Sequence, residues 1–332
     1  MKKLLIALAL LLASCAPARM SLHTPNSNDI QLGGSYTKYT LSQSGTASDP
    51  IVVWGNGATL QCVLITGSYI VWRDTTVTGC QSFGIRVKGA HVQILDNVVT
   101  DVARFNWDGA KCSGAGSWDS AIRAADTTDV TISGNLVYKV CGEGISVLRS
   151  SYVTVSGNTV YDAFSVNIYL DQTSFSAAEN NWSYSTGDTR YYKAGLVARG
   201  LSIGAESYSG WSFSVHDLTI SNNKFERVRG INYIQEQAGT PYSITVRDNQ
   251  FISVAAPLVS LGAWATVSNN VSVTPTPPGT PQTATVTATA TLTPISPTAT
   301  ATAAPSPSAT PFSSPTPECL YFAGHDETVC LK

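Results

Sequence analysis

The sequence contains few charged residues and few residues that bind metal ions. Charged side chains make up 13% of its 332 residues and the net charge is −2, so the charged share is about half the usual one. No basic stripe with interleaved aromatic residues is present, which argues against a nucleic-acid partner. Only two methionines occur, the four histidines lie far apart, and there is no C-x-x-C motif. These absences argue against a zinc site and against a metal carrier.

Long apolar runs are also absent, apart from one short segment near the N-terminus. Leu4 to Ala13 follows two lysines, and it is too short for a membrane span, which needs roughly 20 residues. This pattern is typical of a secretory signal. The run ends at Leu12-Ala13-Ser14-Cys15, which resembles the lipobox of bacterial lipoproteins. The resemblance implies a signal over residues 1–14 and a lipid on Cys15, which anchors the chain at an outer membrane or extracellular face. An ordinary secretory signal is the alternative.

Lipidation of Cys15 would leave an even number of cysteines, because the chain has seven. An even remainder in an oxidising compartment suggests disulfides. The sequence does not fix the pairing, but three pairs would each join neighbouring segments: Cys62–Cys80, Cys112–Cys141 and Cys319–Cys330.

A repeated motif organises the middle of the chain. Stretches rich in β-branched residues end in asparagine, as in Val153-Thr-Val-Ser-Gly-Asn158. From Thr75, steps of 22, 38, 23, 23, 42, 26 and 21 residues lead to Asn97, Asn135, Asn158, Asn181, Asn223, Asn249 and Asn270. A second motif runs in phase with the first: Phe83-Gly-Ile85, Ser120-Ala-Ile122, Glu143-Gly-Ile145 and Val166-Asn-Ile168. Two short strands per repeat, with insertions in the two long steps, predict a stacked solenoid and exclude helices.

The recurring asparagine has a physical reason in such a solenoid. Asparagine tolerates the left-handed backbone of a turn. At a coil spacing of roughly 4.8 Å its amide can bond to the asparagines above and below. Ordinary turns of a β-sandwich are the alternative explanation.

The repeat, the asparagine ladder and the opening Ser44-Gly-Thr46 and Asp49-Pro-Ile-Val-Val53 resemble the right-handed parallel β-helix superfamily. That superfamily has a pectin-lyase-like fold and includes polysaccharide lyases. The resemblance implies an all-β solenoid of about 8–9 coils over residues 45–273. Residues 15–44 are then the anchor segment and an N-terminal cap. Residues 274–317, rich in Thr, Pro, Ala and Ser without charge, read as a disordered linker, and residues 318–332 as a disulfide-closed tail.

Candidate catalytic residues lie on the outward side of the second motif. The isoleucines point inward, so Arg86, Arg123, Ser146 and Tyr169 form an outward row. Lys88 and Asp171 lie in the next row, and Asp119 and Glu143 stand at the beginnings of two strands. The alternative is that these residues are only solvated surface.

The resemblance to polysaccharide lyases implies one set of roles. Lys88 or an arginine would remove the proton α to a uronate carboxylate, and a second cation, or Ca²⁺ held by Asp119 and Glu143, would neutralise that carboxylate. In a hydrolase, Asp119 and Glu143 would instead be the carboxylate pair. No tight motif of either kind is present.

The two insertions, about residues 103–118 and 185–199, are predicted to leave the solenoid at the same edge. Three coils apart, they would form the walls of a cleft roughly 14 Å wide. Candidate substrate-binding residues are Tyr169, Asp171, Trp107, Tyr191, Tyr192 and Trp211. Alternatively, the aromatic residues of the loops pack down as lids.

Two functions remain open from the sequence. The first is an exported, monomeric protein that binds a polysaccharide near Arg86 and Arg123. The sequence does not decide whether this protein also cleaves the polysaccharide. The second is a non-catalytic adhesin or scaffold carried on the Thr/Pro spacer. Ca²⁺ is the only cofactor considered, and the identity of the glycan is not specified.

Overall fold

The computed structural model describes residues 28–114, 118–274, 319–321 and 328–330. The predicted signal segment, Cys15 and almost all of the Thr/Pro-rich linker lie outside these residues. The chain divides into two units, Met1–Thr291 and Leu292–Lys332, which are described separately. Among the described residues, none belongs to a helix long and apolar enough to cross a bilayer.

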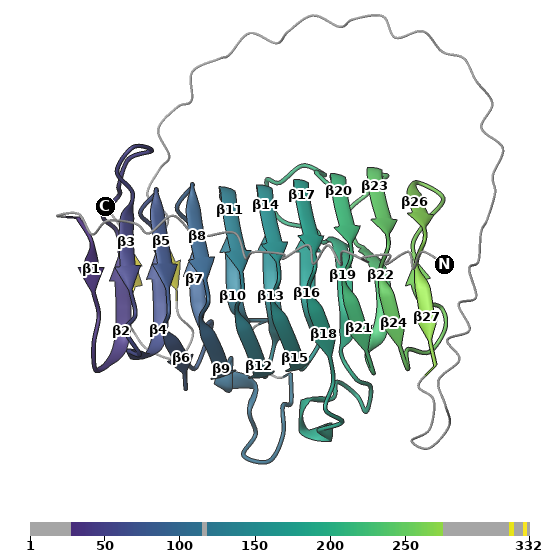
Figure 1. Cartoon of the computed structure of the whole chain (residues 1–332), viewed down its shortest axis with the longest axis horizontal. Coiled ribbons are helices and arrows are strands. Elements are labelled where there is room, and N and C mark those ends of the chain that lie inside the picture. The colour runs from purple at the N-terminus through teal and green to yellow at the C-terminus, as the bar shows by residue number, and fades with distance from the viewer. Residues whose placement is uncertain (1–27, 115–117, 275–318, 322–327, 331–332) are drawn as a thin grey trace, which may run out of the picture. The chain divides into compact units, whose positions relative to one another are not determined.

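The first unit is a parallel β-helix, as predicted. Its strands stand side by side in successive coils (Figure 1), and every strand pair among its described residues is parallel. Each complete coil has three strands, where the sequence motifs indicated two. The unpredicted strands are short and directly follow the asparagine turn, so no separate motif marked them.

The strands form three faces. The first face is a ten-stranded sheet of β1 (Ile30–Gln31), β3 (Ile51–Trp54), β5 (Ile70–Arg73), β8 (Val92–Leu95), β11 (Thr128–Ser133), β14 (Ser151–Ser156), β17 (Ser174–Glu179), β20 (His216–Ser221), β23 (Tyr242–Arg247) and β26 (Ala265–Ser268). The second face comprises β6 (Thr76–Thr78), β9 (Val98–Val102), β12 (Leu136–Val140), β15 (Thr159–Ala163), β18 (Trp182–Tyr184), β21 (Lys224–Glu226), β24 (Gln250–Ile252) and β27 (Val271–Val273).

The third face comprises β2 (Ser35–Leu41), β4 (Thr59–Ile65), β7 (Ile85–Val87), β10 (Ser120–Ala125), β13 (Glu143–Leu148), β16 (Val166–Asp171), β19 (Arg199–Ala205), β22 (Arg229–Gln235) and β25 (Val259–Ser260). Strand β2 pairs in parallel with β4, so the solenoid begins before residue 45. Of the residues expected to cap its end, Ile30–Gln31 and Ser35–Leu41 form strands of a first, largely exposed coil.

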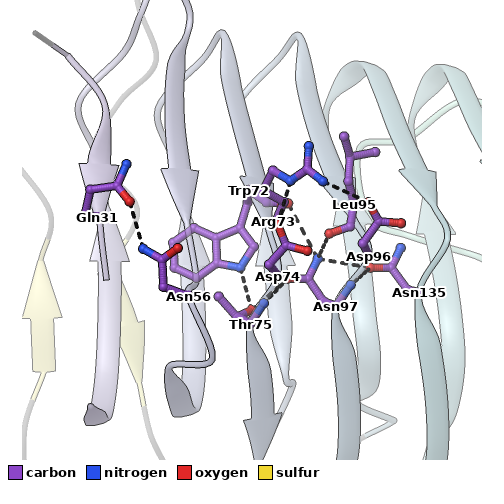
Figure 2. Close-up of polar contacts among 10 residues, drawn as sticks. All are labelled: Gln31, Asn56, Trp72, Arg73, Asp74, Thr75, Leu95, Asp96, Asn97 and Asn135. Carbon is purple, nitrogen blue, oxygen red and sulfur yellow. Dashed lines mark hydrogen bonds and ion pairs between the residues drawn. The ribbon is translucent and has the colours of Figure 1, made fainter. Parts of the chain in front are cut away.

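The asparagine ladder is present at every predicted step. Asn158 illustrates one rung: its Nδ2 donates to Asn181 Oδ1 at 3.0 Å, and its Oδ1 accepts from the backbone and side-chain N–H groups of Asn135, both at 2.9 Å. Figure 2 shows where the ladder begins, with Thr75 Oγ1 donating to Asn97 Oδ1 at 2.7 Å. All rungs except the last, Asn270, are buried, and each amide satisfies backbone groups that burial would otherwise leave unpaired.

The second motif supplies the apolar core beneath the third face. Ile85, Ile122, Ile145 and Ile168 are all fully buried. The residue before each isoleucine is also buried, and at three of the four positions it is glycine or alanine. A Cβ on Gly144 would lie 2.3 Å from the carbonyl oxygen of Asn167 and 2.5 Å from a methyl of Val160. Glycine at this position is therefore a packing requirement.

The second unit contains one described element, an antiparallel pair of β28 (Cys319–Tyr321) and β29 (Thr328–Cys330), in which Cys319 stands opposite Cys330. The backbone therefore pairs as a hairpin would require. The disulfide between these two cysteines stays a prediction.

Candidate functional site

Two insertions leave the solenoid at the corner between the second and third faces. The first connects β9 to β10 and contains the 3-10 turn η1 (Arg104–Asn106), and the second connects β18 to β19 and contains η2 (Thr189–Tyr191). Both extend from the same edge of the molecule (Figure 1). Their common edge agrees with the sequence analysis.

The predicted open cleft between the insertions is wrong, because the two loops touch. The backbone N–H of Cys112 donates to the carbonyl oxygen of Arg190 at 2.9 Å. The rings of Trp107 and Tyr191 lie 6.2 Å apart, and Tyr191 is only 5% exposed. Burial of these rings against each other removes apolar surface from water, which favours closed loops over separate walls.

Two of the predicted disulfides are present, Cys62–Cys80 and Cys112–Cys141. The second ties the first insertion to the corner between β12 and β13. The side chain of Asn106 adds a hydrogen bond of 2.9 Å to the carbonyl oxygen of Cys141. The disulfide therefore fixes the middle of the first insertion, at Cys112, to the solenoid.

A pocket of about 490 Å³, here called the junction pocket, lies where the insertions meet. One wall of the pocket is aromatic. It is formed by Trp118, which is 42% exposed and stacks on Phe164 with 6.3 Å between ring centroids. The ammonium of Lys193 lies 4.1 Å from the centroid of the Trp118 ring. The other lining residues are Lys111, Cys112, Ser113, Gly114, Tyr192, Ala194 and Gly195. The pocket thus combines aromatic surface with two cations.

A buried polar cluster adjoins this pocket on the third face. Ser120 Oγ donates to Glu143 Oε2 at 3.0 Å, and Arg123 Nε donates to the hydroxyls of Ser120 and Ser146 at 3.2 and 3.3 Å. The guanidinium of Arg123 lies 3.6 Å from Glu143 and 3.9 Å from Asp119. Arg123 also donates to the backbone carbonyl of Trp118. The arginine therefore connects the cluster to the aromatic wall of the junction pocket.

Glu143 has an unusual proton affinity. Its side chain is almost enclosed, and burial raises its pKa to about 7, against the opposing charge of Arg123 and the hydrogen bond from Ser120. Near neutral pH the carboxyl is therefore divided between its protonated and ionised forms.

A second polar cluster lies further along the same face. Tyr169 donates to Glu206 at 2.8 Å, and Tyr208 donates to Asp171 and, at 3.0 Å, to the other oxygen of Glu206. Tyr169 and Asp171, predicted to bind substrate, are 2% and 0% exposed. Burial raises the pKa of Asp171 to about 6. These side chains point out of the sheet as predicted, but the excursion that follows β19 covers them.

Arg86 and Arg123 are register partners on adjacent coils, as predicted. Burial, and secondly the charge of Arg123, lower the pKa of Arg86. The guanidinium of Arg86 lies over Phe83 at 5.2 Å, and its Nε has no hydrogen-bond partner among the described residues. Lys88 is exposed in the turn after β7, and within the described part of the chain no hydrogen bond or ion pair joins its side chain to the cluster.

The profile of the family described as "Right handed beta helix region" matches residues 51–273, which is more than half of the chain. The chain belongs to the right-handed β-helix family. No curated protein sequence matches this β-helix protein.

Among solved structures, this β-helix protein is similar to an alginate lyase from Paenibacillus sp. str. FPU-7, with 17% identity and a TM-score of 0.40 over 72% of this chain and 92% of the other. Pectate lyase Pel9A shares 13% identity, with a TM-score of 0.45 over 73% and 70% of the two chains. The endo-xylogalacturonan hydrolase from Aspergillus tubingensis shares 14% identity, with a TM-score of 0.41 over 74% and 73%. At this level of identity the likeness concerns the fold alone.

The β-helix brings together some of the predicted residues and separates others. Asp119, Arg123 and Glu143 form one cluster, Tyr192 lines the junction pocket, and Trp107 and Tyr191 line a different pocket on the second face. Trp211 is 36% exposed in the excursion after β19. Sequence reasoning missed Ser120, Phe164 and Glu206. Ser120 had a detectable signal, since it is aligned with Glu143 in the second motif, whereas Glu206 lies outside every repeat.

Among the described residues, no group of three or more His, Cys, Asp and Glu side chains is placed to hold a metal ion. The guanidinium of Arg123 lies within 4 Å of the two carboxylates considered for Ca²⁺, Asp119 and Glu143. Calcium binding there stays a prediction.

Proposed function

We propose that this β-helix protein binds an anionic polysaccharide in the junction pocket. The observation that carries the proposal is the partly exposed Trp118 ring with the ammonium of Lys193 beside it. The exposed part of the indole offers apolar contact to a sugar, and an ammonium suits the carboxylate of an acidic sugar. A sugar in contact with the indole also lies within reach of the cation. The pocket volume of about 490 Å³ falls within the range of small-ligand sites.

The pocket is also organised before any ligand arrives. Arg123 holds the carbonyl of Trp118, and the Cys112–Cys141 disulfide holds the opposite side of the loop. Groups fixed in the binding geometry lose less conformational entropy when a ligand binds, which favours affinity.

We further propose that the protein is exported and lipid-anchored through Cys15. Support comes from the signal-like N-terminus and the lipobox resemblance in the sequence. The two disulfides suit an oxidising compartment. Mass spectrometry of the protein purified from bacterial membranes would test the lipid, and an unmodified Cys15 would contradict it.

Trp118→Ala and Lys193→Ala are each expected to weaken binding of an acidic hexasaccharide about tenfold, since an aromatic contact contributes about 0.5–1.5 kcal/mol and a hydrogen bond to a charged group about 1.5–3 kcal/mol. Isothermal titration calorimetry with hexagalacturonate and with hexamannuronate measures the effect. Lys38→Ala, an exposed cation on β2, is the matched control and is expected to bind as the wild type does.

Two results would contradict this placement. One is equal affinity for an uncharged cello-oligosaccharide and for the acidic oligomers. The other is unchanged binding by both Trp118→Ala and Lys193→Ala.

A second candidate function is cleavage of the same polymer. The observation that favours it is Glu143, whose pKa of about 7 suits a proton donor near neutral pH. Against it, Glu143 is only 7% exposed and one of its two carboxyl oxygens, Oε2, already accepts a hydrogen bond from Ser120. New reducing ends or unsaturated products from uronate polymers, lost in Glu143→Gln while binding is kept, would establish an enzyme. Binding without turnover would instead favour the adhesin or scaffold.

A further inference from the structure

The second face carries a separate pocket of about 410 Å³, here called the second-face pocket. Its floor is built by β9 and β12 and its walls by the two insertions. The lining residues are Thr100, Asp101, Arg104, Trp107, Tyr138, Lys139, Arg190 and Tyr191. None of them lines the junction pocket. Consecutive residues of the second insertion thus face different pockets, with Tyr191 in this one and Tyr192 in the other.

The walls of the second-face pocket are held rigidly. Trp107 and Tyr191 pack against each other, and the hydrogen bond from Cys112 to Arg190 joins the two loops beside them. The Cys112–Cys141 disulfide fixes the first loop to the end of β12, next to the floor. These contacts tie both walls of the pocket to each other and to the solenoid.

The lining of the second-face pocket has an excess of positive charge, with three cations and one carboxylate. Arg104 is held by Asp101 at 2.5 Å, and Arg190 is held by Asp188 at 2.6 Å. Within the described residues no carboxylate lies within ion-pair distance of Lys139; Asp188 attracts it at longer range, and its ammonium lies 5.8 Å from the centroid of the Tyr138 ring. The backbone of Lys139 is left-handed, with φ of 56°, and its side chain is exposed. Lys139 is thus a cation available to a ligand at the mouth of the pocket.

A row of tyrosines continues from the floor of the second-face pocket. The ring of Tyr138 stacks on Tyr161 at 5.1 Å, and Tyr161 stacks on Tyr184 at 4.5 Å, one ring per coil. Stacked rings cover one another's faces, so they offer their edges and hydroxyls outward. Burial raises the pKa of Tyr161 to about 12, which keeps its hydroxyl protonated at physiological pH. The hydroxyls of the row stand one coil apart and can form hydrogen bonds with successive hydroxyls of an extended sugar chain.

We propose that the second face is a separate binding site for an anionic polysaccharide, with an acidic sugar in the second-face pocket among Arg104, Lys139 and Arg190. The polymer continues along the hydroxyls of the tyrosine row. This inference shares its ligand class with the proposed function but not its location. Two sites on different faces would let one chain of sugars be held at two places, which raises avidity without new contacts.

Lys139→Ala in the full chain tests the site, with hexagalacturonate as the probe. The wild type is expected to bind two molecules per chain by calorimetry. Lys139→Ala is expected to weaken one of these events about tenfold, as one charge pair would, and to leave the other unchanged. Tyr161→Phe, which removes only a hydroxyl, should weaken the same event by a smaller factor. Lys38→Ala is the control, and thermal unfolding checks that each variant is folded.

Hydrogen–deuterium exchange assigns each event to a face. Ligand-induced protection of residues 136–140 and 159–163 should disappear in Lys139→Ala and persist in Trp118→Ala. A single binding event that Lys139→Ala leaves intact and Trp118→Ala weakens would overturn this inference and leave the proposed function standing. A single event that only Lys139→Ala weakens would support the second-face site and overturn the proposed junction-pocket site. No binding by the wild type would overturn both.

Discussion

Replacing Asn158 with alanine is expected to lower the free energy of unfolding by about 4 kcal/mol, because several buried groups lose their partners at about 1–3 kcal/mol each. The Asn158 side chain donates to the carbonyl oxygens of Ile132 and Ser156 and to Asn181, and it accepts from Asn135. Asn158 and the rungs on either side of it, Asn135 and Asn181, are each 1% exposed, so water cannot replace the lost bonds. Urea unfolding followed by circular dichroism measures the loss.

Two asparagines of this chain provide matched controls. Asn270→Ala removes the last, partly exposed rung, where water can substitute, and should cost only about 1–2 kcal/mol. Asn180→Gly alters an exposed residue with φ of 57°, a conformation that glycine adopts freely, and should change stability by less than about 0.5 kcal/mol. Equal losses for Asn158→Ala and Asn180→Gly would contradict a structural role for the ladder.

Glu143→Gln is expected to make the protein more stable above pH 7 and to leave it nearly unchanged below pH 4.5. The pKa of Glu143 lies at about 7 in the folded protein and near its ordinary 4.5 in the unfolded chain. The folded state therefore holds this proton more tightly. Its stabilising effect is complete below pH 4.5 and is lost as the pH rises through 7. The loss is on the order of 3 kcal/mol, because a tenfold change in proton affinity corresponds to about 1.4 kcal/mol.

Denaturant unfolding at pH 4, 6 and 8 measures this effect. The exposed residue Glu236 provides the control, and Glu236→Gln should follow the wild-type pH dependence. Asp171, with a pKa raised to about 6, contributes a separate and smaller decline that both variants keep. Parallel pH profiles for wild type and Glu143→Gln would show that Glu143 is not buried in the way described.

The sequence predicted the ladder and the core beneath the third face because both depend on identity at fixed intervals. Each rung must be Asn, or Thr at Thr75, since only such side chains bond to the next coil and to the backbone together. Glycine before isoleucine was likewise visible, and the contact between Gly144 and Asn167 explains it. A repeat of about 22 residues therefore predicts those contacts that occur in every coil.

The candidate site was predicted less well because its contacts occur once. The pairing of Cys112 with Arg190, the stacking of Trp118 on Phe164 and the cover that Glu206 provides for Asp171 involve irregular loops. The sequence repeat contains no information about the positions of such loops. The insertions were therefore placed at the correct edge but with an open cleft between them, and residues counted as outward-facing, such as Tyr169, are buried.

The contact between the two insertions affects the order in which the coils of the solenoid unfold. In a stack of coils each coil touches only its neighbours, so unravelling can proceed one coil at a time from either end. These loops begin three coils apart and contact each other across the coils between them. Unfolding that starts at the N-terminal or the C-terminal end must break this loop contact before it reaches the coils between the two insertions. The coils that carry both pockets should therefore open together, as one cooperative block, after the ends have already loosened.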